Sequence, residues 1–404
     1  MSHVLNLSLL KRNRDYGLLY SGQFISFIGT MITGVALPYQ VYQLTQSTLM
    51  VGLLSLAQLI PLLITALLGG VFADRYNRRM LLIGSELLLA ISCGLLVLNA
   101  HSANPSLIII FLIGSLMSAI NGLHRPAFDS ITQQLVAVED YKTVGALASF
   151  KFSFCMIAGP AIAGLVIAHY GMVVTYFIDL LTFAISLLSL CLMHSIPKPV
   201  AHEHLSILAS LKQGVQFALK RQELMGSYWV DFIAMIFGMP NALFPAMAES
   251  LGGAKALGLL YAAPAVGALF ISFFSGWTAR VKQYGKAIAI AAGLWGIAII
   301  GFGLAGSLWL ALIFLGLAGA LDTISGIFRS TLWNETIPHE YRGRLAGIEM
   351  VGYLSGPKLG DTEAGLVAAA FGITASVVSG GILCVLGVAI CCWYMPKFWQ
   401  YRSN

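Results

Sequence analysis

Long apolar stretches follow one another along almost the whole chain, separated by short polar segments. A helix needs about 20 mainly apolar residues to cross the hydrocarbon core of a bilayer. Twelve segments reach that length, at residues 16–39, 49–72, 80–100, 106–135, 142–169, 172–194, 224–247, 256–277, 286–305, 308–335, 343–371 and 372–395. Because lipid offers no partner for free backbone N–H and C=O groups, each segment is expected to be helical. The pattern predicts an all-α membrane protein.

The composition agrees with a membrane protein and disfavours a soluble one. Of the 404 residues, 58% are hydrophobic and 10% are charged, and the mean hydropathy is +0.83. Soluble domains carry about 25% charged residues, and a soluble chain this poor in charge would expose an aggregation-prone apolar surface. The first apolar stretch is a full span long and lacks a small-residue cleavage pattern. We therefore interpret it as a retained helix and not as a signal peptide.

Lys and Arg residues gather in alternate loops. They precede the first span, follow spans 2, 4, 6, 8 and 10, and follow the last span, whereas the opposite loops hold only Lys255. Because positive residues mark the cytoplasmic side of a membrane protein, this pattern places both termini and the long middle loop in the cytoplasm. It also accounts for the net charge of +6 without a nucleic-acid partner.

The longest polar segment divides the chain into two halves. We predict a six-helix half at 1–194, a cytoplasmic linker at 195–223 and a second six-helix half at 224–404. Apolar residues recur along the linker at helical spacing, so we expect it to contain an amphipathic helix at the membrane surface. These residues are Leu205, Leu208, Leu211, Val215 and Leu219.

The two halves have related sequences. Residues 163–171 read AGLVIAHYG and residues 364–372 read AGLVAAAFG, 201 positions later. Gly-Pro pairs precede both stretches at nearly the same distance. Such duplication is typical of secondary transporters, whose substrate site lies between the repeats near the middle of the bilayer.

The loop between the second and third spans carries the most specific motif. It reads GVFADRYNRR and resembles the signature loop of the major facilitator superfamily, Gly-x-x-x-Asp-Arg-x-Gly-Arg-Arg. Asn77 replaces the second glycine, and Asn tolerates the left-handed backbone that a tight turn can need. The resemblance implies the major facilitator fold, with 12 transmembrane helices as two six-helix pseudo-repeats. It also implies a cytoplasmic conformational latch, in which Asp74 faces the start of helix 11 near Arg342 and Arg344. The residues of that latch are Gly70, Asp74, Arg75, Arg78 and Arg79.

Ionisable residues inside spans are costly and usually functional. In the fold that the chain resembles, four cations can face one cavity and favour an anionic substrate, and two amides add hydrogen-bonding groups. The predicted cavity residues are Gln23, Asn121, Arg125, Lys151, Arg329 and Lys358. A carboxylate in low-dielectric surroundings gains affinity for protons, so we predict proton coupling at Asp231, Asp322 and Glu349.

Other intramembrane charges leave two interpretations open. A structural role is as compatible with the sequence as a functional one for Glu86, Asp179, Arg125 and Asp129. Arg125 and Asp129 lie one helical turn apart and can pair with each other. Buried ion pairs that only fix helix packing are the general alternative for every residue of this kind.

The whole chain is similar to bacterial exporters of the enterobactin exporter type. The similarity is carried by LNLSLLK at 5–11, GVALP at 34–38, VGL at 51–53, GGVFADRY at 69–76, FPAMA at 244–248, LYAA at 260–263 and GRLAG at 343–347. It implies proton-driven export of a siderophore by alternating access. Siderophores are commonly anionic, which agrees with the intramembrane Lys and Arg residues. Residues 158–164, AGPAIAG, partly resemble the antiporter motif of exporters and favour export. The alternatives are multidrug efflux, of macrolide or tetracycline type, and nutrient import.

No sequence motif points to an enzyme or to an ATP-driven pump. The chain lacks Gly-x-Ser-x-Gly, His-Glu-x-x-His and Gly-x-x-x-x-Gly-Lys. The six cysteines lie in apolar runs without metal-ligand spacing, and His202-Glu203-His204 has no third ligand nearby. We therefore expect no catalytic residue, cofactor or metal. The expected partners are a small molecule, protons and the lipid of a bacterial inner membrane, with the protein acting as a monomer.

Overall fold

The computed structural model describes residues 7–194 and 207–403, and the regular elements within these ranges are all helices. Before residue 195 lie α1 (Ser8–Arg12), α2 (Arg14–Thr45), α3 (Thr48–Arg75), α4 (Arg78–His101), α5 (Leu107–Leu135), the 3-10 turn η1 (Val138–Asp140) and α6 (Tyr141–Cys191). After residue 206 lie α7 (Ile207–Leu219), α8 (Gln222–Phe237), η2 (Asn241–Leu243), α9 (Phe244–Leu251), α10 (Ala254–Phe273), η3 (Ser275–Arg280), α11 (Tyr284–Gly303), α12 (Leu308–Thr336), α13 (His339–Phe371), α14 (Ile373–Tyr394) and α15 (Pro396–Trp399). The prediction of an all-α protein is confirmed.

Ten stretches of the described residues are long and apolar enough to cross a membrane. One of them, Val138–Cys191, has 54 residues, about twice the length that one crossing needs. Helix α13 has 33 residues but is not among the ten, because charged side chains interrupt its apolar run. The protein is thus a multi-pass membrane protein, and the number of twelve spanning helices stays a prediction.

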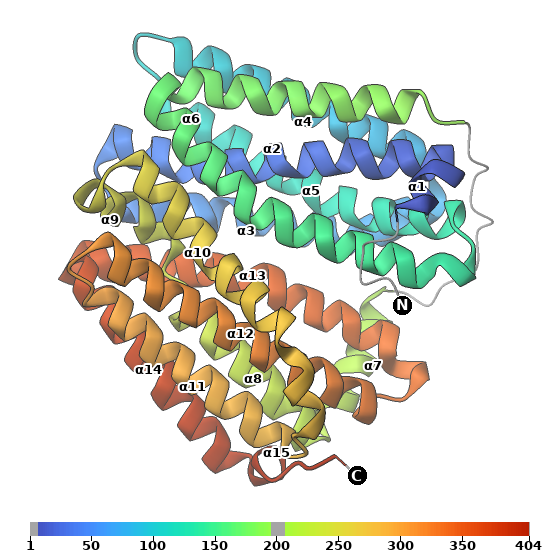
Figure 1. Cartoon of the computed structure of the whole chain (residues 1–404), viewed down its shortest axis with the longest axis vertical. Helices are drawn as coiled ribbons and strands as arrows, with labels where there is room; N and C mark the ends of the chain where they lie inside the picture. The colour runs from blue at the N-terminus through green and yellow to red at the C-terminus, as the bar shows by residue number, and fades with distance from the viewer. Residues whose placement is uncertain (1–6, 195–206, 404) are drawn as a thin grey trace. The chain divides into compact units, whose positions relative to one another are not determined.

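The chain divides into two compact units. Unit 1 contains residues 1–45 and 57–202, and unit 2 contains residues 46–56 and 203–404. In unit 1, α6 lies along α2 and α4, and in unit 2, α11 packs between α12 and α14 (Figure 1). Helix α3 is shared, since its first turns belong to unit 2 and the remainder to unit 1. The predicted division at 194 and 223 stays a prediction.

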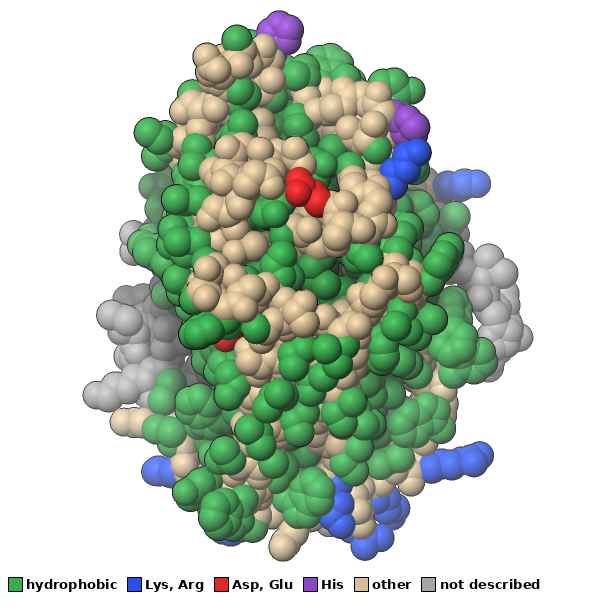
Figure 2. Space-filling model, turned by 90° about the vertical axis from the view of Figure 1, so that its left-hand side faces the viewer, with side chains coloured by type: hydrophobic (Ala, Val, Ile, Leu, Met, Phe, Trp, Pro, Cys, Tyr) green, Lys and Arg blue, Asp and Glu red, His purple; other side chains and the backbone are tan. Residues whose placement is uncertain are grey.

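The surface is apolar, as contact with lipid requires. Hydrophobic side chains cover most of the face drawn in Figure 2, on which charged side chains are few. Leu98, Ile108 and Phe273 are each more than two thirds exposed. Aromatic side chains stand out at helix ends, with Trp309 at the start of α12 and Trp393 at the end of α14 both more than 70% exposed. Such residues favour the interface between lipid and water.

Two glycines mark equivalent turns in the repeated sequence. Gly171 interrupts α6 with φ 75° and ψ −174°, and Gly372 separates α13 from α14 with φ 91° and ψ 159°. These are the final residues of the two related stretches. A residue that carries a Cβ atom rarely adopts a positive φ. Glycine therefore lets the chain reverse there without strain. The repeat seen in the sequence therefore reproduces the same backbone turn in each unit.

The seventh predicted span, at 224–247, is not one helix. Helix α8 ends at Phe237, and the chain passes through Gly238 and Pro240 before η2 and α9. Proline has no N–H to donate and disfavours helix in the residue before it, which explains the break. The prediction of a continuous helix here is wrong.

Only part of the predicted linker can be compared with the structure. Residues 195–206, which include Leu205 and the His202-Glu203-His204 segment, lie outside the described residues. Helix α7 follows them and packs against α8 and α13, where the ring of Phe217 stacks on Tyr341 with 4.3 Å between centroids. The described part of the linker thus belongs to the body of unit 2.

A close approach between α2 and α6 depends on Gly29. A Cβ atom at this position would overlap Thr182 Oγ1 and Asp179 Oδ1. Asp179 is fully buried and accepts hydrogen bonds from Thr33 Oγ1 and from Cys93 Sγ. Small residues let membrane helices approach closely, and here the approach brings the Thr33 hydroxyl of α2 to a buried carboxylate of α6.

Gly29→Ala is therefore expected to destabilise unit 1. The added methyl group forces α2 away from Asp179, and overpacking of this kind costs about 1–3 kcal/mol. The matched control is Gly34→Ala on the same helix, because nothing lies within 4 Å of a Cβ there. Thermal unfolding of both purified variants in detergent measures the difference, and equal stability of the two would contradict the packing described.

Candidate substrate and coupling sites

Unit 2 buries a cluster of opposite charges on α8 and α12. Arg329, with 11% of its side chain exposed, forms an ion pair with Asp231, and its second amino group lies 3.8 Å from Asp322 Oδ1. A buried charge is costly unless it is paired. Within the described part of the chain, Arg329 Nε has no hydrogen-bond partner. The described polar contacts of this guanidinium are therefore the two made by its amino groups, with Asp231 and Asp322.

The cluster unites residues that the sequence assigned to different roles. Asp231 and Asp322 are predicted proton carriers, whereas Arg329 is a predicted cavity residue. The third predicted carrier, Glu349 on α13, is exposed and acts electrostatically on Arg329. Asp322 has 44% of its side chain exposed and Asp231 has 17%. When one of the three carboxylates is protonated, Arg329 can form its ion pair with another of them. The roles of these residues in proton coupling and substrate binding stay predictions.

Asp361 on α13 closes the break after α8. The backbone N–H of Ala242 in η2 donates to Asp361 Oδ1 at 2.9 Å, and Ser55 Oγ donates to Asp361 Oδ2 at 3.0 Å. The break deprives Ala242 of a helical acceptor, and lipid supplies none. Lys358, one turn before Asp361, interacts with it electrostatically. The assignment of Lys358 to a substrate cavity stays a prediction.

The same region of unit 2 holds the first turns of α3. Thr48 Oγ1 donates to the Gly365 carbonyl at 3.3 Å, and Thr362 Oγ1 donates to the Gly52 carbonyl at 3.2 Å. A Cβ on Gly52 would lie 3.0 Å from the Asp361 carbonyl oxygen. Helices α3 and α13 therefore meet backbone to backbone beside the Asp361 carboxylate.

In unit 1, Lys151 of α6 lies among phenylalanine rings. Its Nζ atom is 4.3 Å from the ring centroid of Phe128 on α5 and 6.0 Å from that of Phe27 on α2. Phe27 stacks in turn on Phe152, with 6.1 Å between centroids. A cation over an aromatic face is attracted to the ring quadrupole. The arrangement holds one partly buried positive charge in an aromatic setting.

The other predicted cavity residues of unit 1 differ in exposure. Arg125 is exposed on α5, one turn from the exposed Asp129, which interacts electrostatically with both Arg125 and Lys151. Asn121 is partly buried and donates to the Met117 carbonyl of its own helix at 2.9 Å. The structure thus brings Arg125 and Lys151 into one electrostatic group, and their contact with a substrate stays a prediction.

Gln23 is buried and bonded inside unit 1. Its Nε2 atom donates to Glu86 Oε1 at 2.6 Å and to Ser186 Oγ at 3.0 Å. Sequence reasoning left Glu86 undecided and did not connect it with Gln23. A usable signal was present, because Gln23 and Ser26 stand three residues apart on one helix, where they can meet the same acceptor.

The signature loop begins α4 with a side-chain cap. Asn77 Oδ1 accepts hydrogen bonds from the N–H groups of Arg79 at 3.0 Å and Met80 at 3.2 Å. Its backbone is extended, with φ −65° and ψ 115°, so the interpretation of Asn77 as a left-handed turn residue is wrong. Asn is a preferred helix N-cap, which explains its presence here.

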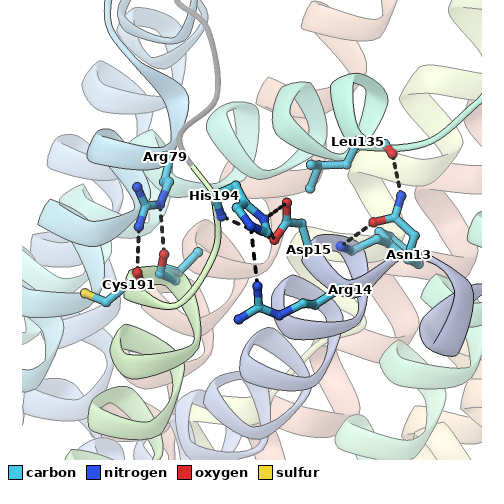
Figure 3. Close-up of polar contacts among 9 residues, drawn as sticks. Asn13, Arg14, Asp15, Arg79, Leu135, Cys191 and His194 are labelled. Atoms are coloured by element: carbon cyan, nitrogen blue, oxygen red, sulfur yellow. Dashed lines mark hydrogen bonds and ion pairs between the residues drawn. The ribbon is translucent and has the colours of Figure 1, made fainter.

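The arginines of this loop bind helix C-termini. Arg79 Nε donates to the Leu190 carbonyl at 2.9 Å and Arg79 Nη2 to the Cys191 carbonyl at 2.8 Å, at the end of α6 (Figure 3). Arg78 Nη1 donates to the Ser130 carbonyl of α5 at 3.3 Å. Cations stabilise the negative end of a helix dipole.

Three further latch residues cannot be compared with the prediction, because the surroundings of Gly70 and the side chains of Asp74 and Arg75 are not among the described parts of the chain. Arg342 is described, and its Nη2 donates to the Asn334 carbonyl at 3.2 Å at the end of α12. The latch as a whole stays a prediction.

The end of α6 and the start of α2 are tied by polar side chains. His194 Nδ1 lies 3.0 Å from Asp15 Oδ2, and Asn13 Nδ2 donates to the Leu135 carbonyl at 2.7 Å (Figure 3). Asn13 and Arg79 thereby satisfy carbonyl groups at the ends of α5 and α6, and the backbone N–H of His194 donates to Asp15 Oδ1 at 3.2 Å.

The comparisons with known proteins agree with this arrangement. A profile of the transmembrane secretion effector family matches residues 10–400. The chain belongs to this family. The family is part of the major facilitator superfamily, as the signature loop indicated, and the protein is a transport protein and not an enzyme.

Curated relatives in the family are named as exporters. The enterobactin exporter EntS of Shigella boydii serotype 18 is 30% identical over 396 residues, covering 96% of this chain and 94% of that protein. EntS of Escherichia coli O81 has the same identity and coverage.

Solved structures of low identity share the fold. The nucleoside transporter NupG is 15% identical with a TM-score of 0.73, covering 94% of this chain and 99% of that one. A bacterial homolog of the human lysosomal transporter Spinster, in an inward-facing and unoccupied conformation, is 15% identical with a TM-score of 0.73, covering 97% of this chain and 98% of that one. The predicted major facilitator fold is confirmed.

Proposed function

We propose that the protein exports a small anionic molecule of the siderophore class across the bacterial inner membrane, by proton-coupled alternating access. The observation that carries the proposal is Lys151, a cation held against the rings of Phe128 and Phe27. Cations inside a membrane protein usually serve a substrate or an ion. The EntS relatives support the substrate class, because their name gives enterobactin as the exported molecule. The positive loops support cytoplasmic termini.

The setting of Lys151 suits an anion that carries aromatic groups. The ammonium group attracts a carboxylate or phenolate, while the rings of Phe27, Phe128 and Phe152 offer faces and edges for stacking. Arg125 adds a second positive charge on the neighbouring helix. An uncharged drug would gain from the rings but not from the two cations, so the anionic class is favoured.

Proton coupling is proposed for the charge cluster of unit 2. Protonation of Asp231 or Asp322 would remove one of the negative charges that hold Arg329. The Arg329 side chain would then form its ion pair with the carboxylate that remains charged. Because Asp231 is on α8 and Arg329 on α12, the proton would change the attraction between two helices. Such a change is the kind of switch that alternating access requires.

The function is tested in the organism that carries the gene. Mass spectrometry compares the medium and the interior of iron-starved cells with and without it. A chelator that disappears from the medium and accumulates inside the mutant supports siderophore export. Unchanged secretion contradicts it, and a drug-susceptibility panel on the same two strains then decides the multidrug alternative.

Lys151→Gln is expected to raise the KM for an anionic substrate about tenfold, equivalent to ~1.4 kcal/mol of lost binding. The variant keeps a polar side chain of similar length but loses the charge. Transport into inverted vesicles over a range of enterobactin concentrations measures KM. The matched control is Lys142→Gln, an exposed lysine on the same helix, and a control as impaired as the Lys151 variant would contradict the assignment.

A further inference from the structure

Unit 1 contains a sealed carboxylate that meets a histidine. Glu86 of α4 has no exposed surface, and its Oε1 atom lies 3.1 Å from Nε2 of His124 on α5. His124 keeps 16% of its side chain exposed. One member of the pair is therefore fully enclosed by protein, while the other keeps some exposed surface.

The carboxylate is surrounded by polar groups from two other helices, α2 and α5. Gln23 Nε2 of α2 donates to Oε1 at 2.6 Å, and Ser26 Oγ of α2 donates to Oε2 at 3.2 Å. With Nε2 of His124 they give one carboxylate three polar partners. Gln23 also reaches Ser186 of α6, so α2, α4, α5 and α6 meet at this point.

The geometry places the exchanging proton on the histidine. An ionised carboxylate only accepts hydrogen bonds, so Nε2 of His124 must carry a hydrogen in both charge states of the ring. The charge of His124 then changes at Nδ1, where a proton is taken from solvent or returned to it. When His124 is charged, it forms an ion pair with Glu86 in low-dielectric surroundings. When it is neutral, one hydrogen bond remains and the attraction between α4 and α5 is weaker.

The charges around the pair come from its neighbouring helices. Asp179 on α6 acts electrostatically on Glu86, and the α2 groups at the carboxylate are the neutral Gln23 and Ser26. On α5, His124 interacts with Asp129, which also interacts with Arg125 and Lys151. The charge of His124 is thus felt by the residues proposed to receive the anion.

Asp179 provides a contrast within the same unit. It is also fully buried, but the donors to it in the described part of the chain are neutral: Thr33, Thr182 and Cys93. No change of charge in a basic partner alters those bonds. Glu86 differs because one of its partners is a histidine, a side chain that can carry a positive charge.

We infer that Glu86 and His124 form a proton-binding site in unit 1, in which His124 takes up and releases the proton at Nδ1 and the carboxylate of Glu86 stabilises the charged ring between α4 and α5. The role in coupling rests on the proposed function, whereas the charge change of His124 depends on no substrate. The helix that responds is α5, which also carries Arg125.

The first experiment needs no substrate. Protein labelled with nitrogen-15 histidine is placed in lipid nanodiscs, and NMR spectra are recorded between about pH 5 and 8, where histidines change charge. His124→Gln identifies the His124 signals by their loss. We expect those signals to change from the charged to the neutral pattern in the wild type, and the charged pattern to be depleted in Glu86→Gln. Signals that stay constant over this range, or that are unaffected by Glu86→Gln, overturn the site.

The second experiment measures coupling in inverted vesicles with enterobactin as the probe. His124→Gln and Glu86→Gln are each expected to reduce transport driven by a pH gradient at least tenfold, while exchange of enterobactin down its own gradient stays within about twofold of wild type. His169→Gln, an exposed histidine of α6, is the control and should match the wild type. Variants that keep gradient-driven transport overturn the coupling role. A wild type that does not move enterobactin contradicts the proposed substrate, and the NMR result still decides the proton site.

Discussion

Arg329→Met is expected to abolish export and to lower the free energy of unfolding by about 3–5 kcal/mol. The substitution leaves Asp231, with 17% of its side chain exposed, as a buried carboxylate without its cation. Removing one partner of a buried ion pair costs more than removing both, because the remaining charge keeps its desolvation cost. Thermal unfolding in detergent and export from whole cells measure the two effects.

A second variant separates stability from transport. The double substitution Arg329→Met with Asp231→Asn removes both charges and should recover most of the lost stability without restoring export. Asp322→Asn is the matched control, since Asp322 is 44% exposed and lies 3.8 Å from the arginine. It should change stability by less than about 1 kcal/mol. Full export by the double variant would show that the cluster only fixes helix packing.

Asp361→Leu is expected to reduce both stability and export severely. Leucine has a similar volume but accepts no hydrogen bond, so the Ala242 N–H and the Ser55 hydroxyl both lose their acceptor. Two buried donors left unsatisfied cost about 2–6 kcal/mol together. The same substitution loosens the contact between the first turns of α3 and α13. Unfolding temperature and the level of protein in the membrane provide the measurements.

Asp361→Asn tests whether the hydrogen bonds or the charge matter. Asparagine keeps one oxygen that can accept from Ala242, so its loss of stability should be less than half that of leucine. A loss as large as that of leucine would mean that the charge opposite Lys358 is what the site needs. An unchanged unfolding temperature in both variants would contradict the described role of Asp361.

Much of the fold follows from the sequence because lipid leaves few solutions. Apolar runs must be helices in a bilayer, and the related stretches that end at Gly171 and Gly372 indicated two similar halves. The break after α8 was less visible, because Gly238 and Pro240 lie in a run that is otherwise as apolar as its neighbours. Local composition predicted a membrane span at this position, but it did not predict that the helix is interrupted between α8 and η2.

The site was harder to predict because its contacts join distant segments. Asp361 meets Ser55 across 306 positions and Ala242 across 119, and no local pattern links them. Arg329 was predicted to face a substrate, yet the structure pairs it with Asp231 on another helix. Residue type identified which side chains are unusual in a membrane, whereas tertiary packing decides what each one touches.

Transport by the purified protein in liposomes tests proton-coupled siderophore export most directly. Enterobactin is placed on both sides of the membrane at equal concentration, and a pH gradient is imposed while enterobactin and internal pH are followed together. Proton-coupled export predicts that enterobactin accumulates on the more acidic side as protons leave that side, and that a protonophore abolishes the accumulation. Enterobactin that stays at equal concentration, or that moves equally with and without the protonophore, would contradict it.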